Sequence, residues 1–256
     1  MKTEELGPHE ELHRVWEVLG IELIELPHSH KCVALWEPGK GLGEKAQSSV
    51  YHVLEEISDH AYGRKSEHYW KKRRKEKFLH SLEGLFFIVD KNDKIVGFNG
   101  ISLLRRRWFV NIYVDVIGTL PFASIRGLVP DFLKSVIVNR VLRKWKEWIQ
   151  PVYVSTRTQN PVVYKLAHLL VKDDQLYPST KPDVITPEAI LRCANDLATE
   201  LGKRKPLGPD LIWRNAYHTT IYEPNENRKD ENDPISALFN KLKEKDGFVL
   251  IGPARL

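Results

Sequence analysis

The stretch 85–104, LFFIVDKNDKIVGFNGISLL, is the clearest structural signal in the chain and the starting point for its fold. Two runs rich in β-branched and aromatic residues flank Lys91, Asn92 and Asp93, a polar triplet typical of a hairpin turn. The next stretch, 107–118, RWFVNIYVDVIG, has the same strand-forming composition. The sequence therefore predicts a β-hairpin followed directly by a third strand.

Helical and extended patterns alternate on both sides of this hairpin. Apolar spacing predicts a helix over 9–19 and two helices over 44–80 broken near Gly63, and 31–37 is typical of a short strand. Beyond the hairpin we expect a helix at 131–149, a strand at 151–158, a helix at 161–171, a helix at 186–202 with Thr186 as cap and Pro187 at its first position, and a final strand at 247–256. This order favours an α/β (α+β) fold.

The length and composition indicate a folded protein with a sizeable core. The chain has 256 residues, 42% of them hydrophobic, and no boundary sharp enough for two domains, so we expect a single domain over 1–256. Its core would span about 31–180, with an N-terminal helical extension (1–30) and a C-terminal substrate-side segment (181–256). No run is long enough for a membrane span. Cys32 and Cys193 form no disulfide framework, which favours a cytoplasmic setting.

The stretch 118–142, GTLPFASIRGLVPDFLKSVIVNRVL, predicts a strand that ends in a turn and opens a helix. The first turn of a helix carries backbone N–H groups without intrahelical partners, and a diphosphate fits there. Gly127 provides room and Arg126 a charge, while Pro130 favours a helix start near 130–131. A plain bend between two pieces of the core is the alternative interpretation.

Residues 85–171 resemble the GNAT superfamily of acyl-CoA-dependent N-acyltransferases. In that family a hairpin and a long strand precede a turn of the form P-x-x-(Q/R)-x-x-G-x-(G/A). Pro121, Ser124, Gly127 and Val129 occupy the four defining positions of this turn, and two of them, Ser124 and Val129, depart from the family's residue types. Further on, STRTQNPVVYKL (155–166) resembles the family's next strand and its Asn-containing loop.

The resemblance implies a mostly antiparallel mixed sheet flanked by helices, with N- and C-terminal additions, and acetyl-CoA or another acyl-CoA as cosubstrate. An amine would attack the thioester directly, and the thioester would be held in a gap beside the end of strand 107–118. The implied cofactor-binding residues are Thr119, Leu120, Ser124, Ile125, Arg126, Gly127, Leu128, Val129 and Asn160, with backbone N–H groups near Thr119 and Leu120 polarising the thioester carbonyl.

Two residues are candidates for proton transfer. Asp115 is the carboxylate nearest the implied reaction centre and the candidate base, directly or through water. Tyr164 is the candidate acid for the departing thiolate. Each also has a structural interpretation: a hydrogen bond beside the turn for Asp115, and core packing for Tyr164.

Other patterns suggest binding without deciding it. Three possible zinc ligands occupy alternate positions and would point to one side of a strand: His28, His30 and Cys32. No second cluster completes the ligand set, so we expect no metal. The net charge of +5 suits an anionic partner such as RNA or an acidic protein. The basic clusters 70–77 and 103–108 have the composition of nucleic-acid binders, but 70–77 is most simply the solvated face of a helix. The cluster 103–108 also suits recognition of the cofactor's 3′-phosphate or of an acidic carrier protein. The first hypothesis is an N-acyltransferase with an amine acceptor. The alternatives are a catalytically inactive binding module of the same fold and a basic RNA-associated modifier.

Overall fold

The protein is described by a computed structural model that covers residues 12, 16, 22–27, 29–63, 65–120, 128–142, 150–217 and 233–255. The chain divides into two compact units. The first comprises Met1–Ser102 and Asp115–Phe132, and the second comprises Leu103–Val114 and Leu133–Leu256. The boundary crosses two strands, β4 (Ile95–Arg105) and β5 (Val110–Thr119), so each of these strands contributes to both units.

The first unit is built on an antiparallel arrangement of β1 to β4. Each of β1–β2, β2–β3 and β3–β4 pairs antiparallel, and Leu120 N–H continues the pairing by donating to the Val96 carbonyl of β4 (2.9 Å). Besides its parts of β4 and β5, this unit contains β1 (Glu22–Leu26), β2 (His30–Trp36), α2 (Pro38–Gly41), α3 (Glu44–Tyr62), α4 (Glu67–Lys75), α5 (Phe78–Ser81), β3 (Gly84–Val89) and α6 (Leu128–Phe132).

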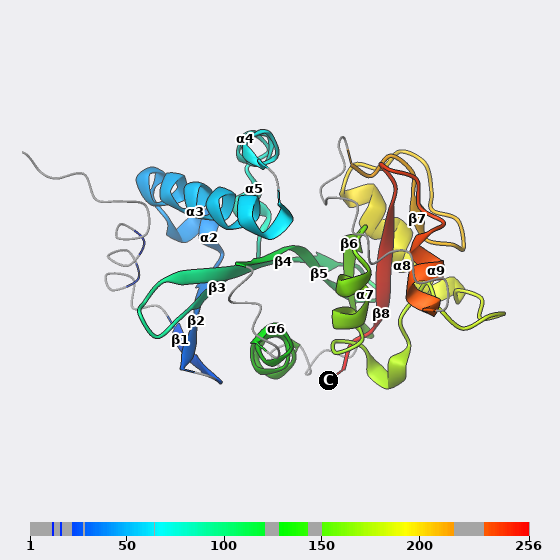
Figure 1. Cartoon of the computed structure of the whole chain (residues 1–256). Helices are drawn as coiled ribbons and strands as arrows, with labels where there is room; N and C mark the ends of the chain where they lie inside the picture. The colour runs from blue at the N-terminus through cyan, green and yellow to red at the C-terminus, as the bar shows by residue number, and fades with distance from the viewer. Residues whose placement is uncertain are drawn as a thin grey trace, which may run out of the picture. The chain divides into compact units, whose positions relative to one another are not determined.

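Side-chain alternation along β3 gives this sheet two buried faces. Phe86 stacks edge-on with Phe132 of α6 (6.3 Å between ring centroids), while its neighbour Phe87 lies opposite Phe98 of β4 on the other face. On that second face Phe98 meets Trp70 of α4 at 6.0 Å. Helices α3 and α4 therefore cover one face and α6 the other (Figure 1). Burying each such phenylalanine contributes about 1.5 to 3 kcal/mol to stability.

The connection from α3 to α4 is fixed by polar side chains. Gly63 ends α3 in the left-handed region (φ 69°), where glycine carries no steric cost. Asp59 then accepts hydrogen bonds from the Ser66 backbone N–H (2.6 Å) and hydroxyl (2.8 Å), and Trp70 Nε1 donates to Ser58 Oγ (3.0 Å). Burial alone would raise the pKa of Asp59, but the bonds from Ser66 and the nearby charge of Lys65 lower it below its ordinary value.

The second unit contains the parallel strand pair. The first half of β5 pairs parallel with β6, β6 pairs antiparallel with β8, and β8 pairs antiparallel with β7. The elements of this unit are the helix Leu133–Leu142, β6 (Val152–Thr158), α7 (Pro161–Ala167), a 3₁₀ turn (Lys172–Asp174), α8 (Glu188–Glu200), β7 (Ile212–Trp213), α9 (Pro234–Phe239) and β8 (Gly247–Pro253).

Helix α8 supplies one side of the core of this unit. Its buried residues fall at the helical spacing expected of an amphipathic helix: Ile190, Cys193, Ala194, Leu197 and Ala198. They pack with Leu104, Phe109, Tyr113, Trp213, Val249 and Ile251 in one apolar cluster. Burial raises the pKa of the Cys193 thiol far above its ordinary value, so this cysteine acts as an apolar core residue.

Because β5 pairs within both units, the hydrogen-bonded order of the eight strands is β1-β2-β3-β4-β5-β6-β8-β7. The expected mixed, mostly antiparallel sheet flanked by helices is confirmed, as are the strand at 31–37, the break at Gly63, the hairpin and the final strand. In the part of the chain that the structure describes, no helix is long and apolar enough to cross a membrane.

Three elements differ from the sequence-based expectation. β1 was not expected, because Glu22 and Glu25 interrupt its apolar residues. The helix expected from 131 begins at Leu128 and continues from Leu133 to Leu142 with π-helical hydrogen bonding. Helix α8 begins at Glu188, with Pro187 rather than Thr186 in the cap position, because the Thr186 hydroxyl donates to the Pro209 carbonyl (2.7 Å). Most of the helix expected at 9–19, and residues 143–149 and 218–232, lie outside the described residues.

Candidate functional site

The start of α6 is where the sequence predicts the diphosphate cradle. Leu128 and Val129 occupy its first two positions, with Leu128 buried and Val129 half-buried, and Asp131 lies in the first turn. Pro130 follows within the helix start, as expected. The candidate residues Ser124, Ile125, Arg126 and Gly127, which form the turn itself, lie outside the described residues. The exposed amides of the turn therefore stay a prediction.

Strand β5 precedes this cradle in the sequence and has β6 as a partner along only part of its length. Its parallel register with β6 runs from Val110↔Val152 to Val114↔Thr156, while the strand itself continues to Thr119. On its other edge β5 neighbours β4, and just past its end the Leu120 N–H donates to the Val96 carbonyl. The Leu120 N–H is thus engaged in the sheet, which removes it from the donors that could polarise a thioester carbonyl.

Asp115 begins the final segment of β5, 115–119, and forms an ion pair with Arg73 of α4. The two side chains are 7% and 17% exposed, so water screens the pair only weakly. The guanidinium also lies over the Phe78 ring, 4.1 Å from its centroid, a cation–π geometry that fixes it further. The Asp115 carboxylate is consequently held in place and neutralised by a partner 42 positions away in the sequence.

Sequence reasoning assigned Arg73 to the solvated basic face of 70–77, yet it is the half-buried member of that run. The sequence did contain a signal that Arg73 faces the interior. Arg73 lies three residues after the buried Trp70, and residues at that spacing share one side of a helix.

Asn99 of β4 is a second polar residue that the sequence did not single out. It is fully buried, and its Nδ2 donates to the Val116 carbonyl of β5 (3.2 Å). Its Oδ1 has no hydrogen-bond partner within the described residues. A buried amide oxygen without a donor costs about 1 to 3 kcal/mol. This acceptor lies beside segment 115–119 in the interior of the first unit.

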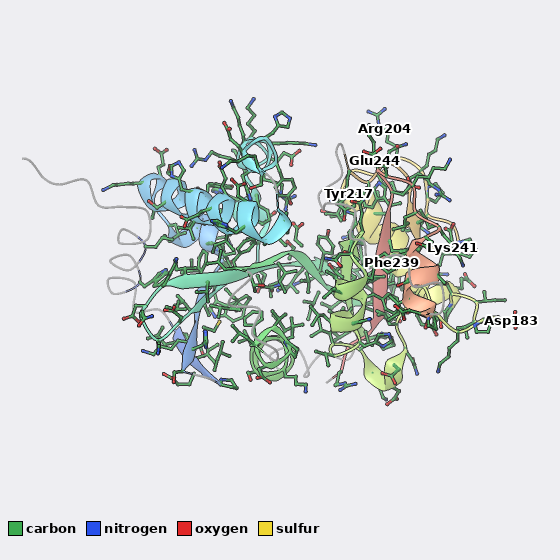
Figure 2. The ribbon with its side chains drawn as sticks, viewed as in Figure 1. Asp183, Arg204, Tyr217, Phe239, Lys241 and Glu244 are labelled. Carbon is green, nitrogen blue, oxygen red and sulfur yellow. The ribbon has the colours of Figure 1, made fainter. Side chains whose placement is uncertain are left out.

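Asn160 and Tyr164 belong to the second unit. Asn160 caps α7: its Oδ1 accepts from the Val162 N–H at 2.9 Å. The Tyr164 hydroxyl donates to the Pro178 carbonyl (2.9 Å), and its ring meets Phe239 of α9 edge-on at 6.1 Å; Phe239 is labelled in Figure 2. Burial raises the pKa of the Tyr164 phenol. Both side chains therefore have structural partners, and their roles toward a cofactor stay predictions.

The possible metal ligands near the N-terminus do not form a cluster within the described residues. His30 and Cys32 are both buried on β2, and His28 lies outside the described part of the chain. Among the residues that the structure describes, no group of three or more His, Cys, Asp or Glu side chains could hold a metal ion.

Comparison with known proteins gives structural similarities only. No family model and no curated protein matches the chain. One similar solved structure is the NatC complex bound to Gag peptide and CoA, at 12% identity and TM-score 0.37, over 88% of this chain and 99% of the other. Another is Arabidopsis thaliana Naa50 with a CoA-containing bisubstrate analogue, at 13% identity and TM-score 0.36, over 86% and 97%. A third is the ribosomal-protein-S5-alanine acetyltransferase of Vibrio fischeri, at 15% identity and TM-score 0.34, over 59% and 84%. At such low identities and TM-scores these likenesses assign no role to any residue of this chain.

Proposed function

We propose that this protein is an acyl-CoA-dependent N-acyltransferase. The observation that carries the proposal is the path of β5: a long strand that leaves its parallel partner after Val114, continues to Thr119 and precedes the helix start at Leu128. A strand that runs on beyond its partner and is followed by a helix N-terminus combines a place for an acyl group with donors for a diphosphate.

The proposed reaction is a direct transfer to an amine. An acyl-CoA supplies the acyl group already activated as a thioester. The amine nitrogen attacks the thioester carbon, a C–N bond forms and the C–S bond breaks. Asp115 takes the proton that the amine loses, directly or through a water molecule, and the departing thiolate takes up a proton, the role for which the sequence offers Tyr164. The backbone amide of Thr119 and the turn before Leu128 stabilise the carbonyl oxygen and the diphosphate.

A binding module without catalysis is the second candidate, and specific contacts favour it. The Asp115 carboxylate is paired with Arg73, the Tyr164 proton is directed to the Pro178 carbonyl, and Leu120 N–H is used by the sheet. Under this proposal the cradle retains CoA and the protein transfers nothing.

Thermal denaturation with acetyl-CoA, CoA and a short RNA separates these functions, since a ligand specific to the native state raises Tm by mass action. Thiol release is then followed with peptide α-amines, lysine amines and small amines. The acyltransferase predicts a Tm increase with both CoA species and turnover with one amine class. The binding module predicts the Tm increase without turnover. An RNA-associated modifier predicts a salt-sensitive response to RNA alone.

The variant Gly127→Glu tests the placement of the cradle. A glutamate there fills and charges the proposed phosphate position, so the CoA-dependent Tm shift should disappear. Gly41→Glu is the matched control, because a β carbon at Gly41 meets no atom within 4 Å. Normal CoA binding by the Gly127 variant would contradict the proposal.

A further inference from the structure

A pocket of about 370 Å³ lies within the first unit, between α3 and the connection from α4 to α5. The α3 side is formed by Glu44, Gln47, Ser48 and Tyr51. These residues recur at the spacing of one helix face, so α3 presents a continuous polar wall with one aromatic ring. The volume is within the usual range for small-molecule sites.

The opposite wall is cationic. It consists of Arg74 at the end of α4, Lys77 in the turn and His80 on α5. Among the described residues that line the pocket, Glu44 is the one carboxylate. Two permanent positive charges and a titratable imidazole therefore face one negative charge, which favours an anionic ligand.

The guanidinium of Arg74 is held in place before any ligand arrives. Its Nη2 donates to the Ser48 hydroxyl (2.9 Å), and its central carbon lies 4.9 Å from the centroid of the Tyr51 ring. The Tyr51 hydroxyl in turn accepts from the Leu79 N–H at 3.4 Å. An arginine fixed by stacking and a hydrogen bond loses less side-chain entropy on binding a phosphate, and its remaining donors suit that geometry.

The backbone at Lys77 and His80 is also held in a specific conformation. Lys77 adopts a left-handed backbone conformation (φ 54°) immediately before α5. A β carbon on Gly39 of α2 would lie 2.5 Å from the His80 Cα. Helix α2 therefore packs backbone to backbone against α5 and fixes the position of His80 at the pocket.

This pocket is separate from the proposed cofactor cradle. Helices α3 and α4 cover the sheet face that carries Phe87 and Phe98, whereas α6 covers the face that carries Phe86 (Figure 1). The sheet of the first unit thus lies between the two places.

We propose that this pocket binds a small phosphomonoester that carries hydroxyl groups, such as a sugar phosphate. Arg74 and Lys77 bind the phosphate, with His80 as a further donor. Glu44 and Gln47 face the hydroxyl-bearing part, where a carboxylate and an amide serve as hydrogen-bond partners. The neutral sugar alone lacks the charge-assisted contacts and binds weakly.

Isothermal titration calorimetry at neutral pH and about 0.15 M ionic strength, where exposed charges are screened, tests this site with glucose 6-phosphate, glucose and inorganic phosphate as probes. We expect glucose 6-phosphate to bind more tightly than inorganic phosphate, and glucose to give no measurable heat. Arg74→Ala should lower the affinity for glucose 6-phosphate by about tenfold or more, the loss expected for a charge-assisted contact. Lys77→Asn removes the charge and keeps a residue that tolerates the left-handed conformation, so it should weaken binding similarly without affecting folding.

The matched control is Lys75→Ala, which removes an exposed cation from the last turn of the same helix but outside the described lining. It should change the dissociation constant less than about twofold, as expected for a screened surface charge. Glu44→Gln should raise the affinity for inorganic phosphate, because it removes a negative charge that repels the anion. Saturating dephospho-CoA, which carries the diphosphate but no phosphomonoester, should leave all values unchanged.

Several results would overturn the proposal. Equal losses with Lys75→Ala and Lys77→Asn would indicate a diffuse basic surface, as would RNA binding that depends on both lysines while glucose 6-phosphate gives no heat. Displacement of glucose 6-phosphate by dephospho-CoA would place the anion in the cofactor cradle instead. Unchanged affinity in the Lys77 variant would exclude the pocket outright.

Discussion

Replacing Arg73 by methionine isolates the role of its ion pair with Asp115. Methionine keeps an unbranched side chain over Phe78 but leaves the Asp115 carboxylate, 7% exposed, without its partner. Removing one member of a buried pair costs about 3 to 5 kcal/mol. Because the Arg73 side chain is 17% exposed, we expect the lower end, about 3 kcal/mol. Loss of the cation–π contact adds about 1 kcal/mol.

The assay is urea unfolding of the single and double variants as a double-mutant cycle. Asp115→Asn alone should cost about 1 to 3 kcal/mol, and adding it to Arg73→Met should recover stability, since no uncompensated charge remains. Glu76→Gln is the matched control, because its pair with Lys72 is about half exposed (51% and 48%) and such pairs contribute about 0 to 1 kcal/mol.

The same variants separate the two roles of Asp115. If Asp115 is the base, Asp115→Asn lowers kcat/KM by about 100- to 10,000-fold while the folded protein still binds CoA. If its role is structural, turnover falls only as far as the folded fraction does. Additive stability losses in the cycle, or a loss below about 1 kcal/mol for Arg73→Met, would refute the reasoning about this pair.

Three further predictions follow from local geometry. Asp59→Asn should reduce the free energy of unfolding at neutral pH and make it fall less steeply in acid. The pKa of Asp59 is lower in the folded than in the unfolded protein, where it is about 3.9. The stabilisation by the ionised Asp59 is therefore complete above about pH 3.9 and is lost as the pH falls through the folded-state pKa. Gly39→Ala should destabilise by about 1 to 3 kcal/mol, because its β carbon would meet the His80 backbone, whereas Gly41→Ala, with no atom within 4 Å, should not destabilise. Asn160→Ala should cost about 1 kcal/mol through loss of the α7 cap while Asn160→Asp retains it; urea midpoints measure the last two.

The elements that were predicted correctly have local causes. The hairpin of β3 and β4 is defined by its own turn residues, and α3 ends at Gly63 because glycine there adopts a left-handed conformation. The missed elements depend on distant partners. β1 carries exposed glutamates, and its register with β2, such as Leu23↔Val33, forms through pairing that no periodicity in five residues reveals.

The candidate site follows the same division. The strand position of Asp115 could be predicted because it is a property of one segment. The proline signal likewise predicted a helix start near 130–131, slightly later than the observed start at Leu128. The Arg73 partner could not, since α4 and β5 are far apart in sequence and the basic run 70–77 has the composition of a solvated face. The involvement of Leu120 N–H in the sheet likewise depends on where β4 lies.

The position of β8 has a consequence for biosynthesis. The strand Gly247–Pro253 lies between β6 and β7, both of which precede it in the sequence. On the ribosome, β6 therefore presents a row of unused amides and carbonyls until β8 has emerged, and such an edge can recruit strands from other nascent chains. A polypeptide that lacks β8 would keep this edge open, so it should yield insoluble product rather than a slightly weakened protein.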